Sequence, residues 1–233
     1  MQMNMNKRFF ITATGTGIGK SFITAALVRQ AKALGHSVAA YKPLISGYTD
    51  ANAHESDTGL LLEAQGLPLT PENIGRVSPW RFTAPLAPSM AAKLEQREIN
   101  FDELVSHSRA TIKGKEDIVL IEGVGGVMVP LNDRHLVIDW IEALNIETIL
   151  VTGSYLGTIS HTLTALFALH KYRIPVNSII VSESETSTVP LANTADELRH
   201  WTKFPVVGVT RRPTGNCHDI AELQPLLAQK EAA

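Results

Sequence analysis

Short, almost uninterrupted apolar runs alternate along the chain with segments of helical periodicity, and this alternation constrains the fold most strongly. The runs that we expect to form strands span residues 9–13, 37–41, 117–121, 147–152, 177–182 and 204–208. Strands that lack polar alternation are typical of a parallel sheet covered on both faces. Helices are expected after the first run as far as Gly35, and at about 56–65, 158–172 and 190–201. The pattern predicts an α/β fold whose crossovers are right-handed.

The 233 residues contain no internal repeat, low-complexity tract or glycine/serine linker. We therefore expect one domain that spans residues 1–233. The segment 46–100 breaks the alternation, and five of the 12 prolines fall between Pro68 and Pro88. The proline cluster predicts an irregular connection, and such connections often carry function in compact α/β domains. We expect it to shape the substrate side of a site.

Charge and cysteine usage exclude several classes of protein. Lys and Arg total 21 and Asp and Glu total 23, which gives a formal net charge of −2. A general nucleic-acid binder or a protein of anionic membranes needs a basic excess, so neither partner is expected. No apolar stretch approaches the roughly 18 residues of a membrane span, and the N-terminus does not resemble a signal peptide. A single cysteine, Cys217, cannot form an intrachain disulfide or a multi-cysteine zinc site, and a cytoplasmic location is expected.

The sharpest local signal is the segment TGTGIGKS at residues 14–21, which follows the first predicted strand and opens the first predicted helix. Its glycines let the backbone turn tightly and bring N–H groups close to an anion. The helix N-terminus adds positive potential. Lys20 can bridge β- and γ-phosphates, and the Ser21 hydroxyl can bind Mg²⁺. The segment predicts a phosphate-binding loop.

The match to the standard phosphate-loop pattern is not literal, because Thr14 stands where the first glycine is usual. One alternative is a glycine-rich turn without a ligand. Another is a dinucleotide-binding loop, but the glycine spacing is one residue short. The second predicted strand also ends in Tyr41 and Lys42 rather than in an acidic residue that could bind a ribose.

Three more residues are expected near this loop. Lys42 follows the second strand at the sheet edge where ligands bind in open α/β folds, and it can face the same phosphates as Lys20. Glu122 ends a buried strand at the usual position of an acid that organises Mg²⁺. Asp57 opens a predicted helix and is the weaker metal candidate. The alternatives are an exposed strand-end lysine, a solvated turn glutamate and an ordinary helix start.

Taken in order, four segments resemble those of the dethiobiotin synthetase family: residues 14–21, 41–47, 122–131 and 156–161. The sequence APLAP at 84–88 also resembles the substrate-side loop of that family. The resemblance extends from Lys7 to about Arg212. Each segment alone is weakly specific, but the ordered set is highly specific.

The resemblance implies a three-layer P-loop NTPase-like fold with a mostly parallel central sheet. It implies a homodimer whose active sites lie at the subunit interface. It also implies an ATP- and Mg²⁺-dependent cyclo-ligase that acts on 7,8-diaminononanoate and CO₂. In that family a carbamate forms on one amine and takes the γ-phosphoryl group. The second amine then attacks the mixed anhydride and closes a ureido ring, so that dethiobiotin, ADP and phosphate are released.

The resemblance also implies roles for individual residues, in four groups. The catalytic group is Lys42, Lys20 and Thr16. The nucleotide group is Gly17, Ile18, Gly19, Lys20, Ser21, Phe22, Asp57, Glu122, Gly123, Val124, Gly125, Ser182, Glu183, Gly208, Val209 and Thr210. The substrate group is Ser46, Gly125, Gly126, Gly157, Thr158, Ile159 and Ser160, of which the last four bind the substrate carboxylate from the partner subunit. The metal group is Ser21, Asp57 and Glu122.

Two segments depart from the family pattern. Ser182 and Glu183 stand where the family often has Asn-Asp for adenine recognition, and residues 208–211 read GVTR where it often has GEIP. The nucleotide preference therefore stays open. The main alternative function is that of a ParA/MinD-like partner-switching ATPase, but such proteins carry a lysine where Gly15 stands here. A cobalamin-type amide ligase would need an additional glutaminase domain, for which the chain has no room.

Overall fold

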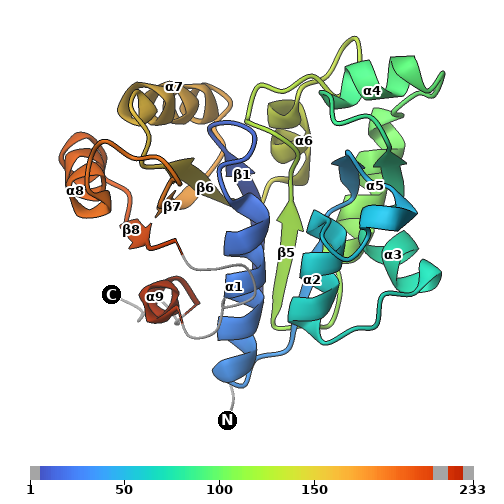
Figure 1. Ribbon diagram of the computed structural model, residues 1–233, viewed down its shortest axis with the longest axis horizontal. Helices are drawn as coiled ribbons and strands as arrows, with labels where there is room; N and C mark the ends of the chain where they lie inside the picture. Colours follow the sequence, from blue (N-terminus) through green and yellow to red (C-terminus); the bar gives the residue numbers. More distant parts are fainter. Residues whose placement is uncertain (1–5, 212–219, 228–233) are drawn as a thin grey trace.

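The computed structural model of the chain describes residues 6–211 and 220–227. Within these residues, six parallel strands form one sheet in the order β2-β5-β1-β6-β7-β8 (Figure 1). Their bounds are β1 Lys7–Ala13, β2 Val38–Tyr41, β5 Ile118–Glu122, β6 Glu147–Gly153, β7 Val176–Ser182 and β8 Val206–Val209. All six predicted strands are present, and each boundary differs from the expected one by at most two residues.

The apolar runs are uninterrupted because helices cover both faces of this sheet. One face packs against α1 (Lys20–Ala33), α2 (Asp57–Gln65) and α9 (Gln224–Leu227), the last preceded by the short helix η2 (Ala221–Leu223). The opposite face packs against α4 (Pro88–Leu94), α5 (Phe101–Ile112), α6 (Val137–Leu144), α7 (Thr158–Lys171) and α8 (Leu191–Trp201). The expected three-layer α/β architecture is confirmed.

The strand order fixes where a ligand can bind. From β1 the chain first crosses to the edge strand β2 and returns to β5 beside β1, and then builds outward on the other side through β6, β7 and β8. The order reverses at β1, and ligands of open α/β sheets bind beyond the carboxyl ends of the strands at such a reversal. The segment 14–21 leaves β1 at this point and leads into α1 (Figure 1).

The expectation of an irregular proline-rich connection is wrong. The segment contains α3 (Pro71–Val77), strand β4 (Trp80–Phe82) and the start of α4. Pro71 and Pro88 each open a helix, where a missing N–H costs no hydrogen bond. Strand β4 pairs in parallel with β3 (Leu44–Ser46) to form a separate two-stranded sheet. The cluster therefore builds ordered structure beside the chain that follows β2.

This ordered segment holds the residues after Ser46 in place. The N–H of Gly47 donates to the carbonyl of Ala84, and the N–H of Tyr48 donates to the carbonyl of Phe82. A short helix η1 (Asp50–Asn52) then leads to α2. No helix among the described residues is long and apolar enough to span a bilayer. Cys217 lies outside the described residues.

Candidate active site

The phosphate loop turns into α1 at Gly19, which is in the left-handed conformation with φ of 93°. A Cβ built at this position would lie 2.7 Å from the hydroxyl oxygen of Ser182, at the end of β7. Both observations require glycine. Gly19 is the N-cap of α1 and no side chain caps the helix, so the first N–H groups of α1 remain available to an anion.

The chain that follows β5 packs against the back of this loop. The N–H of Val127 donates to the carbonyl of Ala13 at 3.1 Å. A Cβ at Gly126 would lie 3.2 Å from the backbone nitrogen of Gly15, which is tighter than most real contacts. Packing against the phosphate loop is therefore what requires glycine at 126.

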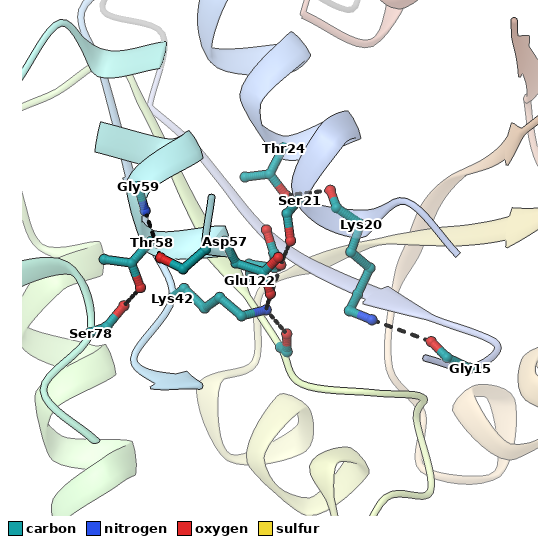
Figure 2. Close-up of polar contacts among 12 residues, drawn as sticks. Gly15, Lys20, Ser21, Thr24, Lys42, Asp57, Thr58, Gly59, Ser78 and Glu122 are labelled. Carbon is teal, nitrogen blue, oxygen red and sulfur yellow. Dashed lines mark hydrogen bonds and ion pairs between the residues drawn. The ribbon is translucent and has the colours of Figure 1, made fainter. Parts of the chain in front are cut away.

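A cluster of charged side chains lies beside the loop (Figure 2). The Nζ of Lys42 lies 2.6 Å from Glu122 Oε1 and 2.9 Å from Asp57 Oδ2, and it donates to the carbonyl of Gly123 at 3.1 Å. Lys42 follows β2, Glu122 ends β5 and Asp57 opens α2. Lys42 is 2% exposed and Glu122 is 0% exposed. The alternatives of an exposed strand-end lysine and a solvated glutamate are both wrong.

The two carboxylates keep Lys42 charged in spite of its burial. Burial alone would lower the pKa of Lys42, but Asp57 and Glu122 outweigh it and hold that pKa above its ordinary value. Burial would raise the pKa of Asp57, but Lys42, the Ser21 hydroxyl and Lys20 together hold that pKa below its usual range. The cluster therefore contains a buried ammonium ion and at least one firmly ionised carboxylate.

Lys20 lies in a different environment from Lys42. Its Nζ donates to the carbonyl of Gly15 at 3.3 Å. Burial and the repulsion of Lys42 lower the pKa of Lys20 to about 8, while Glu122 and Asp57 act in the opposite direction. Because the Lys20 ammonium ion has few partners in the protein, it is suited to pair with a bound anion.

Hydrogen bonds hold Asp57 at the start of α2. The Ser56 hydroxyl caps this helix by accepting from the N–H of Gly59 at 3.1 Å. The next residue, Thr58, is fully buried, and its hydroxyl lies 2.7 Å from that of Ser78 at the end of α3 (Figure 2). This bond joins α2 to the proline-rich segment, so the position of Asp57 depends on that segment.

The residues implied for Mg²⁺ fit such an ion by the chemistry of their oxygens. The Ser21 hydroxyl donates to Glu122 Oε1 at 2.6 Å and also contacts Asp57. Glu122 Oε2 is buried and has no hydrogen-bond partner among the described residues. Mg²⁺ in nucleotide sites takes one or two carboxylates and completes its shell with water and phosphate. No group of three His, Cys, Asp or Glu residues that could hold a metal occurs in the described part of the chain.

A cleft of about 360 Å³ opens over this cluster. Most of the predicted loop and catalytic residues line it, together with Ile45 and Leu60, which the sequence analysis did not identify. The lining residues are Thr16, Gly17, Ile18, Gly19, Lys20, Ser21, Phe22, Lys42, Ile45, Ser46, Asp57, Leu60, Val124 and Gly125. Ile45 and Leu60 are neighbours in sequence of Ser46 and of the α2 start, which is the signal that could have identified them.

The residues implied for adenine and for the substrate carboxylate do not line this cleft. Ser182 and Val209 end β7 and β8 at the same sheet edge, and the N–H of Glu183 donates to the carbonyl of Val209. At the start of α7, Gly157 is the N-cap and Thr158 is buried. The Thr158 hydroxyl donates to the carbonyl of Gly153 at 2.7 Å, so it serves the chain's own structure.

The sequence matches known proteins along most of its length. The chain matches a family described as an AAA domain over residues 7–211. It is 45% identical over 199 residues to the ATP-dependent dethiobiotin synthetase BioD of Acidiphilium cryptum, which covers 84% of this chain and 89% of that protein. It is 42% identical over 207 residues to the enzyme of the same name from Methylobacterium nodulans, which covers 87% and 92%.

Among solved structures, the septum site-determining protein MinD from Pyrococcus horikoshii, complexed with Mg-ADP, resembles the chain with a TM-score of 0.54. The match covers 89% of this chain and 82% of that one, at 16% identity. Similarity at that identity shows a shared P-loop NTPase fold and nothing further about function. The ParA/MinD-like alternative therefore has support from the fold alone.

Proposed function

The chain belongs to the family of ATP-dependent dethiobiotin synthetases, and from that premise we propose that the cleft over its phosphate loop closes the ureido ring of dethiobiotin. The substrates are 7,8-diaminononanoate, CO₂ and ATP, and the other products are ADP and phosphate. The observation that carries the proposal is that Lys20, Lys42 and Asp57 line one cleft at the sheet reversal, where the buried Glu122 pairs with Lys42. The wall of this cleft also includes Ser46, which is suited to hydrogen-bond a polar substrate atom.

The chemistry explains why this reaction needs ATP. A carbamate formed from one amine and CO₂ is a poor electrophile, because its carbon carries no good leaving group. Transfer of the γ-phosphoryl group to a carbamate oxygen gives a mixed anhydride and releases ADP. The second amine then attacks the carbonyl carbon, the C–O bond to phosphate breaks, and the five-membered ring closes. The protein therefore mainly has to position reactants and neutralise charge.

The two lysines divide that task. Lys20 follows the loop glycines and binds the β- and γ-phosphate oxygens, whose negative charge offsets the burial and the repulsion of Lys42 that lower its pKa. Lys42, which follows β2 and also lines the cleft, binds the carbamate and the phosphoryl group in transfer. Thr16 of the loop lines the same cleft and hydrogen-bonds the reacting groups.

Ser21, Asp57 and Glu122 would hold Mg²⁺, which supplies further neutralisation of the phosphate oxygens when it is bound. The carboxylates of Glu122 and Asp57 also hold Lys42, through contacts of 2.6 and 2.9 Å respectively. The same pair of acids therefore sets the position of the catalytic lysine against the loop.

The remaining assignments rest on the family resemblance. In a homodimer, the start of α7 binds the carboxylate of the substrate that lies in the active site of the partner subunit. The residues of this helix start are Gly157, Thr158, Ile159 and Ser160. Ser182, Glu183, Gly208, Val209 and Thr210 border the adenine, and Ser182 lies next to Gly19 of the phosphate loop. The enzyme works in the cytoplasm, and neither nucleic acid nor membrane is its partner.

A product assay tests the proposal. Purified protein is incubated with 7,8-diaminononanoate, bicarbonate and MgATP, and dethiobiotin is measured by mass spectrometry. We expect dethiobiotin in the complete mixture and none when ATP or the diamine is left out. Lys20→Met should remove the product while leaving the thermal unfolding temperature close to that of the wild type. A complete mixture without dethiobiotin would overturn the proposal.

A further inference from the structure

A set of threonine hydroxyls connects the phosphate loop to α7, and no motif or catalytic role accounts for it. The Thr14 hydroxyl lies 3.1 Å from that of Thr152 on β6. The Thr152 hydroxyl in turn lies 2.8 Å from that of Thr158 and accepts from that of Thr162 at 2.9 Å. Thr152, Thr158 and Thr162 are buried, at 0–3% exposed. Thr152 thus connects the loop to the first turns of the helix, beside a longer contact of 3.5 Å between the hydroxyls of Thr14 and Tyr155.

The hydrogens of this set can be assigned so that each hydroxyl is satisfied. Thr158 donates to the carbonyl of Gly153, and Thr162 donates to Thr152. Thr152 then donates to Thr158, and Thr14 donates to Thr152. From the loop through β6 to the helix start, Thr14, Thr152 and Thr158 each donate to the next group in the series. Buried hydroxyls in a chain of this kind are costly to leave without a partner.

Thr14 is where the loop departs from the sheet. Its N–H makes the last bond of the β1–β6 ladder, to the carbonyl of Val151 at 3.0 Å. Beyond it the backbone bends through residues 15–19, whose N–H groups must be aimed at phosphate. A side-chain bond at Thr14 fixes the direction in which the chain enters that bend.

We propose that Thr152 is a positioning residue for nucleotide binding: through Thr14 it holds the entry of the phosphate loop against the first turn of α7. The proposal rests on the proposed function only insofar as the loop binds a nucleotide. It needs neither the diamine nor the dimer. An ordered loop is a preorganised anion site, so loss of the hydroxyl lowers nucleotide affinity in addition to any loss of stability.

The test is the affinity of magnesium ADP, measured by titration calorimetry on the whole protein without the diamine. Thr152→Val keeps the shape of the side chain and removes its hydroxyl, and we expect affinity to fall about fivefold, equivalent to about 1 kcal/mol. Thr152→Ser keeps the hydroxyl and should bind ADP within about twofold of the wild type. In turnover, Thr152→Val should raise KM for ATP by the same factor with kcat nearly unchanged.

Thr148→Val is the matched control. Thr148 lies on the same strand and is fully buried, but its hydroxyl has no partner among the described residues. This substitution should leave ADP affinity unchanged and should not lower the unfolding temperature. The proposal is overturned if Thr152→Val binds ADP as tightly as the wild type, or if Thr148→Val weakens binding equally. It also fails if Thr152→Ser behaves like Thr152→Val.

These outcomes are separable from the failure of the proposed function. Normal ADP binding and the expected variant pattern without dethiobiotin formation would overturn the proposed reaction and support the role of Thr152. Dethiobiotin formation with full ADP affinity in Thr152→Val would support the reaction and overturn the role of Thr152. Should Thr152→Val fold poorly, Thr14→Val removes the other end of the bond and is expected to give the same loss of ADP affinity.

Discussion

Replacement of Lys42 by methionine should destabilise the folded protein as well as stop catalysis. The methionine side chain fills similar space but leaves the Glu122 carboxylate without the ammonium ion 2.6 Å away. That carboxylate is fully buried, so water cannot replace the lost partner. The stability loss measures how strongly the buried charges depend on each other.

The size of the loss follows from the free energy needed to protonate the buried Glu122 carboxylate. A charged carboxylate left unpaired in the interior is so costly that it takes up a proton instead. Protonating a glutamate at pH 7 costs about 3.7 kcal/mol when its reference value in the unfolded chain is about 4.3. The Ser21 hydroxyl still donates to Glu122 and reduces this slightly. We expect Lys42→Met to lower the free energy of unfolding by about 3 kcal/mol at pH 7.

The pH dependence gives the loss a recognisable signature. In the variant the folded state holds a proton that the unfolded state releases above about pH 4.3, so stability falls as the pH rises. The deficit relative to the wild type should therefore shrink by about 1.4 kcal/mol for each pH unit between pH 7 and pH 5. The double variant Lys42→Met/Glu122→Gln removes the buried charge and should regain most of the loss at pH 7.

Urea unfolding followed by circular dichroism, in EDTA and without nucleotide, gives these free energies by linear extrapolation. Lys93→Met is the matched control, because Lys93 pairs with Asp133 at the same 2.6 Å but both side chains are more than two-thirds exposed. It should cost at most about 1 kcal/mol. The reasoning is refuted if Lys42→Met loses less than about 1 kcal/mol at pH 7, or if its deficit is the same at pH 5.

Three further substitutions test other parts of the structure. Gly19→Ala places a Cβ 2.7 Å from the Ser182 hydroxyl at a φ of 93°, so ADP affinity by calorimetry should fall at least about tenfold; unchanged affinity would contradict the loop geometry. Burial would raise the pKa of Glu95, but the bonds from Thr83 outweigh it and lower that pKa, so Glu95→Gln should cost about 1 kcal/mol at neutral pH. In acid unfolding this difference should shrink as the pH falls below about 4.3 and through the lowered pKa of the folded state; a difference that does not change with pH would contradict the role of the carboxylate. Trp140→Ala empties a fully buried site and should cost about 3–5 kcal/mol in urea unfolding, whereas a loss below about 1 kcal/mol would contradict the core packing.

The sheet was predictable because its strands are buried on both faces. Each of its strands contains a nearly continuous apolar run, as in β5, where every residue is buried. The helices and the strand of the proline-rich segment were not predictable, and the reason is local. A cluster of prolines predicts irregular chain, but Pro71 and Pro88 each stand at the first position of a helix, where proline is compatible with that helix.

The site was predictable where its parts follow one another in the chain, as in the phosphate loop. The burial of Lys42 could not be predicted from the sequence, because it depends on Asp57 and Glu122, which belong to elements far apart in the chain. The bond between Thr14 and Thr152 joins residues 138 positions apart and has no sequence signature. Contacts of this kind follow from tertiary packing, so the structure was needed to find them.

The central claim is that the cleft over the phosphate loop uses ATP to close a ring on the diamine. The most direct test measures ADP and dethiobiotin together in one reaction, with 7,8-diaminononanoate as the varied component and several nucleoside triphosphates compared. The account predicts one ADP for each dethiobiotin, and no ADP without the diamine. ATP hydrolysis at the same rate with and without the diamine, with no dethiobiotin formed, would contradict it.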